Sequence, residues 1–210
     1  MLNWPLLSAF IPTFFVVSIT PGMCMTLALS MGITVGVRRA MWMMAGELVG
    51  VTVVATSAAV GVAALMLQYP AAFALFKYAG GAYLAWLGVQ MWRSKGRMAM
   101  PEGENISGGE ASRWQLATQG FVTAIANPKG WAFMLALLPG FTDSTRPLLP
   151  QLGIFLAVML TTEFLSMTLY ALGGRQLRHL LGQDRNLSVL NRVAAVLMVA
   201  VSAFVLLSGG

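Results

Sequence analysis

The sequence has few of the residues that most catalytic and metal sites need. Its 210 residues include one cysteine, Cys24, and one histidine, His179. A single cysteine excludes a disulfide framework, and no cysteine and histidine cluster has the spacing of a metal site. The chain also lacks a serine–histidine pair or zinc motif that would indicate an intramembrane hydrolase. We therefore predict a protein that is not an enzyme and carries no cofactor and no metal.

Charge is also scarce. Charged residues make up 10% of the chain and hydrophobic residues 58%, so most of the chain cannot be a water-exposed surface, which indicates an integral membrane protein. The apolar runs are long and lack the ten-residue alternation of transmembrane strands, which favours helices. The net charge is +6, but the basic residues lie in a few short connections between apolar runs. We therefore expect contact with the lipid bilayer and no nucleic-acid partner.

Six apolar segments are bounded by charged or turn residues. They cover about residues 6–35, 40–67, 71–92, 115–141, 148–173 and 189–208. If alternate connections lie on opposite sides, one side receives only Lys77 and Arg146. The other side receives Arg38, Arg39, Arg93, Lys95, Arg97, Arg113, Arg175, Arg178, Arg185 and Arg192. Because lysine and arginine collect in cytoplasmic loops, this bias predicts that both termini are extracytoplasmic.

A long polar stretch divides the chain into two halves. We predict a first three-helix repeat over 1–93, a cytoplasmic connector over 94–114 and a second three-helix repeat over 115–210. Because each half has an odd number of spans, the second half enters the membrane from the other side. The predicted fold is therefore an all-α integral membrane protein with six transmembrane helices in a 3+3 inverted repeat.

The first helix of each half contains a proline near its middle. Thr20-Pro21-Gly22 follows the pattern F-V-x-x-I, and Asn127-Pro128-Lys129 follows the same pattern in the second half. Proline removes an amide donor and clashes with the carbonyl one turn earlier, so it frees backbone groups that can hold a small ligand. Paired interruptions of this kind indicate the binding site of a transporter. We predict that helices 1 and 4 are broken at these prolines; kinks that only shape packing are the alternative.

Three ionisable residues lie within apolar segments: Glu47, Lys129 and Glu163. Each costs roughly 2.5–3.5 kcal/mol near the bilayer centre, so each should face the protein interior and find partners there. We predict that all three bind substrate, and that Glu47 or Glu163 exchanges the proton of a coupled step. A structural ion pair that holds two helices together is the alternative for either glutamate.

Two other functions remain open from the residues alone. Met23-Cys24-Met25 and the 15 methionines suggest an exporter of a soft metal such as copper(I). In a helix, however, consecutive side chains point about 100° apart and cannot converge on one ion unless the segment is unwound. A non-transporting scaffold that uses the loop around Glu102 to Glu110 is the second alternative.

Glycines recur at four-residue spacing. Gly32 and Gly36 form one such pair, and Gly46 and Gly50 form another. Small residues let helix backbones approach closely in a membrane, so we predict tight helix packing at these positions. The sequence does not decide whether the protein forms a homodimer through these glycine-lined faces.

Four motifs resemble the LysE/RhtB family of bacterial amino-acid exporters. They are the T-P-G of Thr20 to Gly22, the pair Gly46-Glu47, the G-A-Y-L-x-x-L-G of Gly81 to Gly88, and Asn127-Pro128-Lys129. The resemblance implies proton-driven efflux of amino acids or small derivatives across the bacterial inner membrane. The chain departs from the family where Met23-Cys24 replace the usual Pro-Asn and where Glu47 replaces the usual Asp. Both departures touch the expected site, so they leave the identity of the substrate open.

The expected site follows from this chemistry. An amino acid's carboxylate would meet Lys129 and the backbone donors freed around Pro21-Gly22 and Pro128, because exposed helix amino ends favour anions. Its ammonium would face Glu47 or Glu163. The predicted substrate-binding residues are therefore Thr20, Pro21, Gly22, Glu47, Asn127, Pro128, Lys129 and Glu163.

Overall fold

The computed structural model describes residues 3–93, 111–143 and 145–181, together with 189, 192–193, 195–196, 198–200 and 202–203. These residues contain helices and no strand, which confirms the all-α prediction for this part of the chain. The helices are α1 (Trp4–Ile19), α2 (Met23–Thr34), α3 (Val37–Gln68), α4 (Pro70–Arg93), α5 (Arg113–Ala126), α6 (Pro128–Phe141) and α7 (Leu148–Leu181).

Two helices contain stretches that are long and apolar enough to cross a membrane. These stretches are Val37–Gly61 of α3 and Leu148–Gly173 of α7. The pair α1 and α2 passes the same test as one span that is bent by 55°. The described residues therefore provide two or three candidate spans.

Two predicted segments fall largely outside the described residues. The sixth predicted span, 189–208, is described only at scattered positions, and these are helical. Of the predicted connector 94–114, residues 94–110 are not described. The remaining part of that segment includes Arg113 and Trp114, which already belong to α5.

The helices α1, α5 and α6 begin where the sequence supplies a side-chain cap. Asn3 caps α1 by accepting a hydrogen bond from the amide of Leu6 at 3.4 Å. Ser112 and Gln115 form a reciprocal capping box at the start of α5. Asn127 caps α6, and Pro128 occupies the first helical position, where its missing N–H costs nothing.

The helical path is interrupted at two Pro-containing segments. Between α1 and α2, Thr20 adopts an extended conformation with ψ of 129°. Between α5 and α6, Asn127 is extended with ψ of 103°. Both residues directly precede a proline, whose ring disfavours the helical conformation of the residue before it. The local sequence therefore explains why each helix ends where it does.

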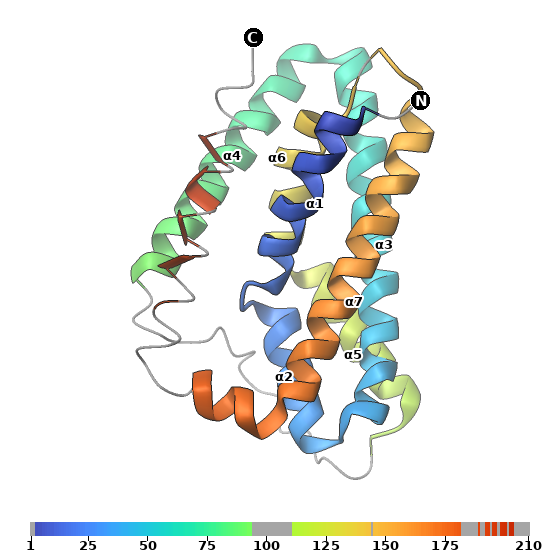
Figure 1. The fold of residues 1–210 in the computed structure, drawn as a ribbon. Coiled ribbons are helices and arrows are strands. Elements are labelled where there is room, and N and C mark those ends of the chain that lie inside the picture. The colour runs from blue at the N-terminus through green and yellow to red at the C-terminus, as the bar shows by residue number, and fades with distance from the viewer. Residues whose placement is uncertain are drawn as a thin grey trace.

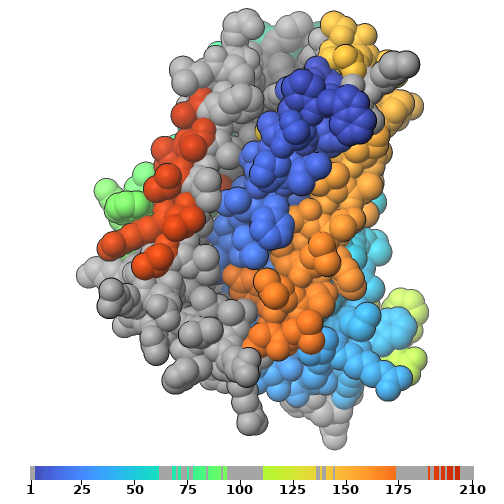
Figure 2. Space-filling model, viewed as in Figure 1, coloured from blue at the N-terminus to red at the C-terminus, as the bar shows by residue number. Residues whose placement is uncertain are grey.

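The interrupted helices have opposite directions in the molecule. Figure 1 shows α1 and α6 in the upper part and α2 and α5 in the lower part, while α3 and α7 run through both. The helices α1 and α2 pack against α7, and α5 and α6 pack against α3. On the face seen in Figure 2, α1 lies directly along α7.

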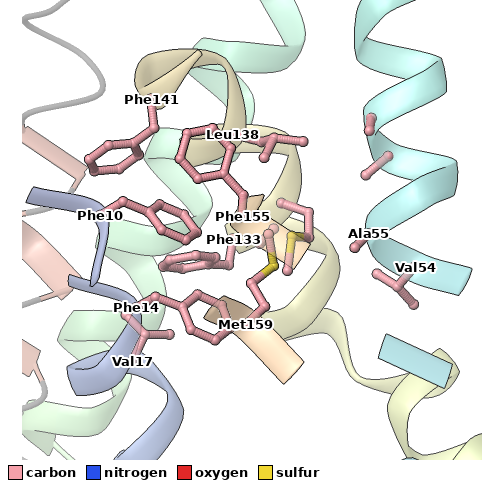
Figure 3. Packing of buried hydrophobic residues seen from close by; sticks show 14 of the residues in the cluster. Phe10, Phe14, Val17, Val54, Ala55, Phe133, Leu138, Phe141, Phe155 and Met159 are labelled. Carbon is pink, nitrogen blue, oxygen red and sulfur yellow. The ribbon is translucent and has the colours of Figure 1, made fainter. Parts of the chain in front are cut away.

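Two apolar clusters fill the interior. The first joins α1, α3, α6 and α7 and is rich in aromatic rings: Phe10 lies 4.6 Å from Phe155 and 5.2 Å from Phe141, measured between ring centroids (Figure 3). The second joins α2 and the first turns of α3 and α5 to the later part of α7, and contains Met31, Met43 and Met167. The two helix interruptions lie between these clusters.

Glycines set the distance between α3 and α5. A Cβ atom on Gly46 would stand 1.8 Å from the carbonyl oxygen of Ala117, and one on Gly120 would stand 2.0 Å from that of Met43. No side chain fits at such distances, so both positions require glycine. The predicted tight packing is confirmed at Gly46, at Gly50, where a Cβ would stand 2.9 Å from the carbonyl oxygen of Phe121, and at Gly32, where it would stand 2.3 Å from that of Ala171. Gly36 differs, because it has a φ of 81° and forms the turn between α2 and α3.

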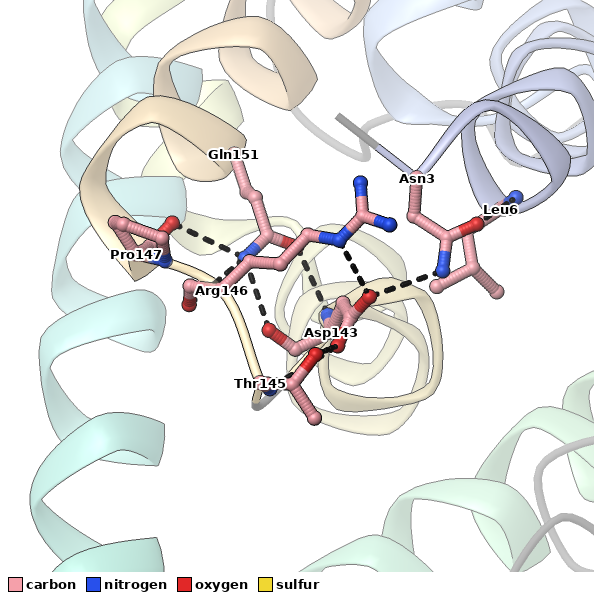
Figure 4. A network of polar contacts seen from close by, with 7 residues as sticks. All are labelled: Asn3, Leu6, Asp143, Thr145, Arg146, Pro147 and Gln151. Atoms are coloured by element: carbon pink, nitrogen blue, oxygen red, sulfur yellow. Dashed lines mark hydrogen bonds and ion pairs between the residues drawn. The ribbon is translucent and has the colours of Figure 1, made fainter. Parts of the chain in front are cut away.

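A polar network joins the start of α1 to the connection between α6 and α7 (Figure 4). The Asp143 carboxylate accepts a hydrogen bond from the Asn3 amide at 3.0 Å and pairs with the Arg146 guanidinium at 3.0 Å. Hydrogen bonds from Thr145 and Asn3, together with Arg146, lower the pKa of Asp143 to about 2. The buried Gln151 amide donates to three backbone carbonyls of the same connection. The network therefore holds the outer ends of α1, α6 and α7 together.

Candidate functional site

A cavity of about 40 Å³ lies where the two interruptions meet, and we call it the central cavity. Polar or small residues of four segments line it: Ser18, Gly22 and Cys24 near the first interruption, Asn127, Lys129 and Gly130 near the second, Glu47 of α3 and Glu163 of α7. Apolar side chains that include Phe14 and Phe133 complete the wall. Five of the eight predicted site residues thus lie around one space: Gly22, Glu47, Asn127, Lys129 and Glu163.

Lys129 connects the two interruptions. Its ammonium donates hydrogen bonds to the carbonyl oxygens of Val17 at 2.8 Å and Thr20 at 3.2 Å. These carbonyls belong to the last turn of α1 and to its C-cap, where helices leave acceptors without intrahelical partners. A cation is favoured at this end of a helix by the dipole. Lys129, which belongs to the second half of the chain, therefore provides the hydrogen-bond donors and the positive charge at the carboxyl end of α1.

Asn127 has two contacts at the second interruption. Its side-chain oxygen accepts a hydrogen bond from the amide of Lys129 at 3.1 Å and so caps α6. Its side-chain amide donates to the sulfur of Cys24 at 3.5 Å. Asn127 therefore links the start of α6 to the first turn of α2.

Glu47 and Glu163 are carboxylates with unused acceptors. Glu47 is 1% exposed, and neither of its oxygens has a hydrogen-bond partner among the described residues. The same holds for Oε2 of Glu163. Neither glutamate lies within 4.0 Å of a described lysine or arginine nitrogen, so the structural ion pair considered above is not observed in this part of the chain. Buried polar groups nearly always have a partner, so these oxygens indicate a place for a polar ligand.

The amino end of α2 differs from that of α6. Gly22 is the N-cap of α2 and provides no side-chain hydrogen bond, which leaves the first amide donors of α2 without a side-chain acceptor. At α6, the side chain of Asn127 occupies the equivalent place. The side chain of Asn127 thus already accepts a hydrogen bond from one of the backbone amides expected to be free around Pro128. The first amides of α2 have no such acceptor, so they are more available to a ligand.

Three predicted residues do not line the central cavity. The hydroxyl of Thr20 donates back to the carbonyl of Val16 at 2.7 Å, while its own carbonyl contacts Lys129. Pro21 is half-buried and Pro128 is exposed. These residues shape the interruptions, and their neighbours provide the side chains of the cavity.

Several contacts near the cavity were not predicted. The Ser18 hydroxyl donates to Ser166 at 3.2 Å, and the Tyr170 hydroxyl donates to the carbonyl of Ile19 at 2.9 Å. Both pairs join α1 to α7. Polar side chains in an apolar segment were the available signal, but a serine or tyrosine costs too little in a membrane helix to stand out.

The Met23-Cys24-Met25 segment is helical rather than unwound. Cys24 and Met25 are buried and Met23 is half-buried, and all three occupy the first turn of a regular helix, where they diverge. Among the described residues, no three side chains of histidine, cysteine, aspartate or glutamate are grouped to hold a metal ion.

An apolar helical bundle with interrupted helices of opposite direction around a cavity with a lysine and unpartnered carboxyl oxygens is characteristic of a membrane transporter. Comparison with known families supports this class, because residues 15–209 match the model described as LysE type translocator. The chain therefore belongs to the LysE type translocator family, which confirms the resemblance found in the sequence. Membership of a translocator family also agrees with a protein that is not an enzyme.

Individual relatives include efflux proteins. The homoserine/homoserine lactone efflux protein of Salmonella typhimurium is 28% identical over 195 residues, which are 93% of each chain. The leucine efflux protein of an Enterobacter species is 31% identical over 130 residues, 62% of this chain and 60% of the relative. A membrane protein of Vibrio cholerae with no described function is 33% identical over 154 residues, 73% of this chain and 72% of the relative. No solved structure matches the chain.

Proposed function

We propose that this protein is a secondary transporter that exports amino acids or small amino-acid derivatives across the bacterial inner membrane by proton antiport. The observation that carries the proposal is the central cavity, where Lys129, Glu47 and Glu163 meet at two interrupted helices. The names of the efflux relatives support the substrate class.

The proposed architecture is a 3+3 inverted repeat with six transmembrane helices. Residues 1–93 form the first repeat, 94–114 the cytoplasmic connector and 115–210 the second repeat, with both termini outside. The opposite directions of the interrupted pairs support this arrangement, as does the packing of each pair on the long helix of the other half. Oligomeric state is separate from this proposal, and a homodimer remains compatible with it.

The proposed binding mode uses both ends of an amino acid. The substrate's carboxylate lies at the uncapped amino end of α2, next to the Lys129 ammonium. That ammonium stands 3.5 Å from the position that a Cβ on Gly22 would occupy, so charge and helix end are adjacent. The substrate's ammonium lies between the unpartnered oxygens of Glu47 and Glu163. Thr20, Pro21, Asn127 and Pro128 fix the backbone around it.

The coupled proton is assigned to Glu47 or Glu163. A carboxylate in a closed apolar cavity must be neutralised by a proton or by a cation. Competition between a proton and the substrate's ammonium for the same oxygens is sufficient for exchange. The cavity must also widen, because about 40 Å³ accommodates only a few water molecules, each of which needs roughly 10–15 Å³. Rocking of one half against the other provides that space.

Inverted membrane vesicles test the proposal. With an acidic interior, wild-type vesicles are expected to accumulate labelled homoserine or leucine, whereas Lys129→Ala and Glu47→Gln should each lower the initial rate at least tenfold. Glu102→Gln is the matched control, because it removes a carboxylate from the predicted connector and should retain the wild-type rate. Membrane abundance of each variant is measured by an epitope tag.

A counterflow assay separates binding from coupling. In preloaded vesicles without a pH gradient, the variant that lacks the proton-carrying glutamate should still exchange substrate at high concentration, because the other glutamate still faces the substrate's ammonium, while Lys129→Ala should not. Full gradient-driven uptake by both Lys129→Ala and Glu47→Gln would remove the site assignment. No uptake of any amino acid by wild-type vesicles would contradict the substrate class.

A further inference from the structure

A groove with a basic entrance runs along the outside of the bundle between α3 and α5, and we call it the α3–α5 groove. Its apolar part has a volume of about 540 Å³ and is lined by Trp42, Ala45, Gly46, Val49, Arg113, Trp114, Ala117, Thr118 and Phe121. Its entrance has a volume of about 580 Å³ and is lined by Arg38, Arg39, Trp42, Ala111, Ser112 and Arg113. Trp42 and Arg113 belong to both parts, so the two are continuous. The groove lies where the first turns of α3 and α5 meet, at the lower right of Figure 2.

Among the residues that the structure describes, the charged side chains lining the entrance are all arginines. Arg38 and Arg113 are exposed, and the guanidinium of Arg113 lies 5.3 Å from the centre of the Trp42 ring. The guanidinium of Arg39 donates a hydrogen bond to the carbonyl of Ala111, which holds the start of α5 against α3. No aspartate or glutamate is among the described residues that line the groove. An anion is the complementary ligand.

The depth of the groove fits one leaflet of a bilayer. From Arg38 to Val49 the helix α3 rises about 17 Å, and from Arg113 to Phe121 the helix α5 rises about 12 Å. Half of a typical hydrocarbon core is about 15 Å thick. Trp42 and Trp114 are 45% and 83% exposed beside the arginines, at the level where tryptophan contacts lipid headgroups. Below them the wall is apolar, and the small residues Ala45, Gly46 and Ala117 leave a shallow depression in it.

We propose that the α3–α5 groove binds one anionic phospholipid of the cytoplasmic leaflet. The phosphate lies between Arg38 and Arg113, and one acyl chain lies along Ala45, Val49 and Phe121. The lipid then contacts both halves, because α3 belongs to the first half and α5 to the second. This site is distinct from the central cavity and does not depend on the substrate that the cavity takes.

Native mass spectrometry of the purified full-length protein tests this site. Phosphatidylglycerol and phosphatidylcholine with identical acyl chains are added to the detergent-solubilised protein, and bound lipid is counted. The wild type should retain phosphatidylglycerol preferentially. Arg38→Gln with Arg113→Gln should weaken that retention by roughly fivefold for each arginine removed. Arg93→Gln with Lys95→Gln removes the same charge elsewhere and should leave retention unchanged.

Two further measurements distinguish a bound phospholipid from a bound phosphate without acyl chains. Ala45→Trp keeps every arginine but fills the apolar part from an exposed position, so it should lower retention of the lipid. Glycerol phosphate, which has the headgroup charge but no acyl chain, should bind at least tenfold more weakly than phosphatidylglycerol.

Three results would overturn the proposal. One is equal retention of both lipids by the wild type, and another is equal loss in the groove variant and its charge control. The third is phosphatidylglycerol binding that appears only after Glu102, Glu104 and Glu110 are changed to glutamine, which would make the chain's own acidic segment the occupant.

Discussion

Asn127 combines a structural and a site role in one side chain. Its oxygen caps α6, and its amide contacts the sulfur of Cys24 across the junction of the two halves. Asparagine is suited to both contacts because it offers an acceptor and a donor on one short side chain. A residue of this kind is expected to affect stability and transport separately.

Replacement of Asn127 tests the capping role. Asn127→Ala should lower the free energy of unfolding by ~1 kcal/mol through loss of the cap, and thermal unfolding of the purified protein should shift down by roughly 2–4 °C. Asn127→Ser keeps an acceptor for the Lys129 amide and should restore most of that shift. A drop of equal size in both variants would contradict the capping role.

At this scale the sequence predicted the charged residues of the cavity but not their partners. Glu47, Lys129 and Glu163 were found because a charge in an apolar segment is costly enough to require a reason. The contact of Lys129 with the carbonyls of Val17 and Thr20 could not be predicted, because every residue offers a carbonyl and only the path of the chain selects one. The same reason explains why Tyr170 was missed.

Among the helices, the packing of α3 on α5 depends most directly on residue size. Gly120 faces the carbonyl of Met43 and the amide of Glu47, so this glycine also determines where the Glu47 backbone lies. Any side chain at Gly120 must push the two backbones apart, since neither contact is with a flexible side-chain end.

A pair of glycine variants tests this packing. Gly120→Ala should destabilise the protein by about 1–3 kcal/mol or more, because α3 and α5 must separate. Gly61→Ala, in α3, is the matched control: a Cβ there meets nothing within 4 Å, and alanine favours the helix by up to about 1 kcal/mol. Thermal unfolding should therefore move down for Gly120→Ala and stay level or rise for Gly61→Ala. Equal unfolding midpoints would exclude a size restriction at Gly120.

Helix ends were predicted less well than helix positions. The apolar run of the fifth predicted span stops at residue 173, yet α7 continues to Leu181. Hydropathy reports where a segment prefers lipid, whereas backbone hydrogen bonding continues past that boundary into polar residues. Prolines were more informative, because the residue before each proline leaves the helical conformation for a local steric reason. Asn127 provides a side-chain cap to α6, whereas Gly22 provides none to α2. This difference between the two amino ends became clear only from the structure.

For the whole molecule, orientation in the membrane follows from the distribution of arginine and lysine. The distribution predicts that the connector is cytoplasmic and that the connection between α6 and α7 lies outside.

Cysteine labelling tests this orientation. Because Cys24 is the one cysteine of the sequence, Cys24→Ala provides a background without thiols. In intact cells, a membrane-impermeant maleimide should label Thr145→Cys in that background. It should label Gly103→Cys only after the cells are permeabilised. The reverse pattern would place the termini in the cytoplasm and contradict the assigned topology.

The contact between Lys129 and the end of α1 has a consequence for the empty transporter. One ammonium has three donors, and two of them are already engaged by Val17 and Thr20. A carboxylate that draws this ammonium away would loosen the link between the halves at the moment of loading. Under the proposed antiport, the form that carries neither substrate nor proton keeps this link together with its charged carboxylates, so it would resist reorientation, and return of the substrate-free site would require the proton.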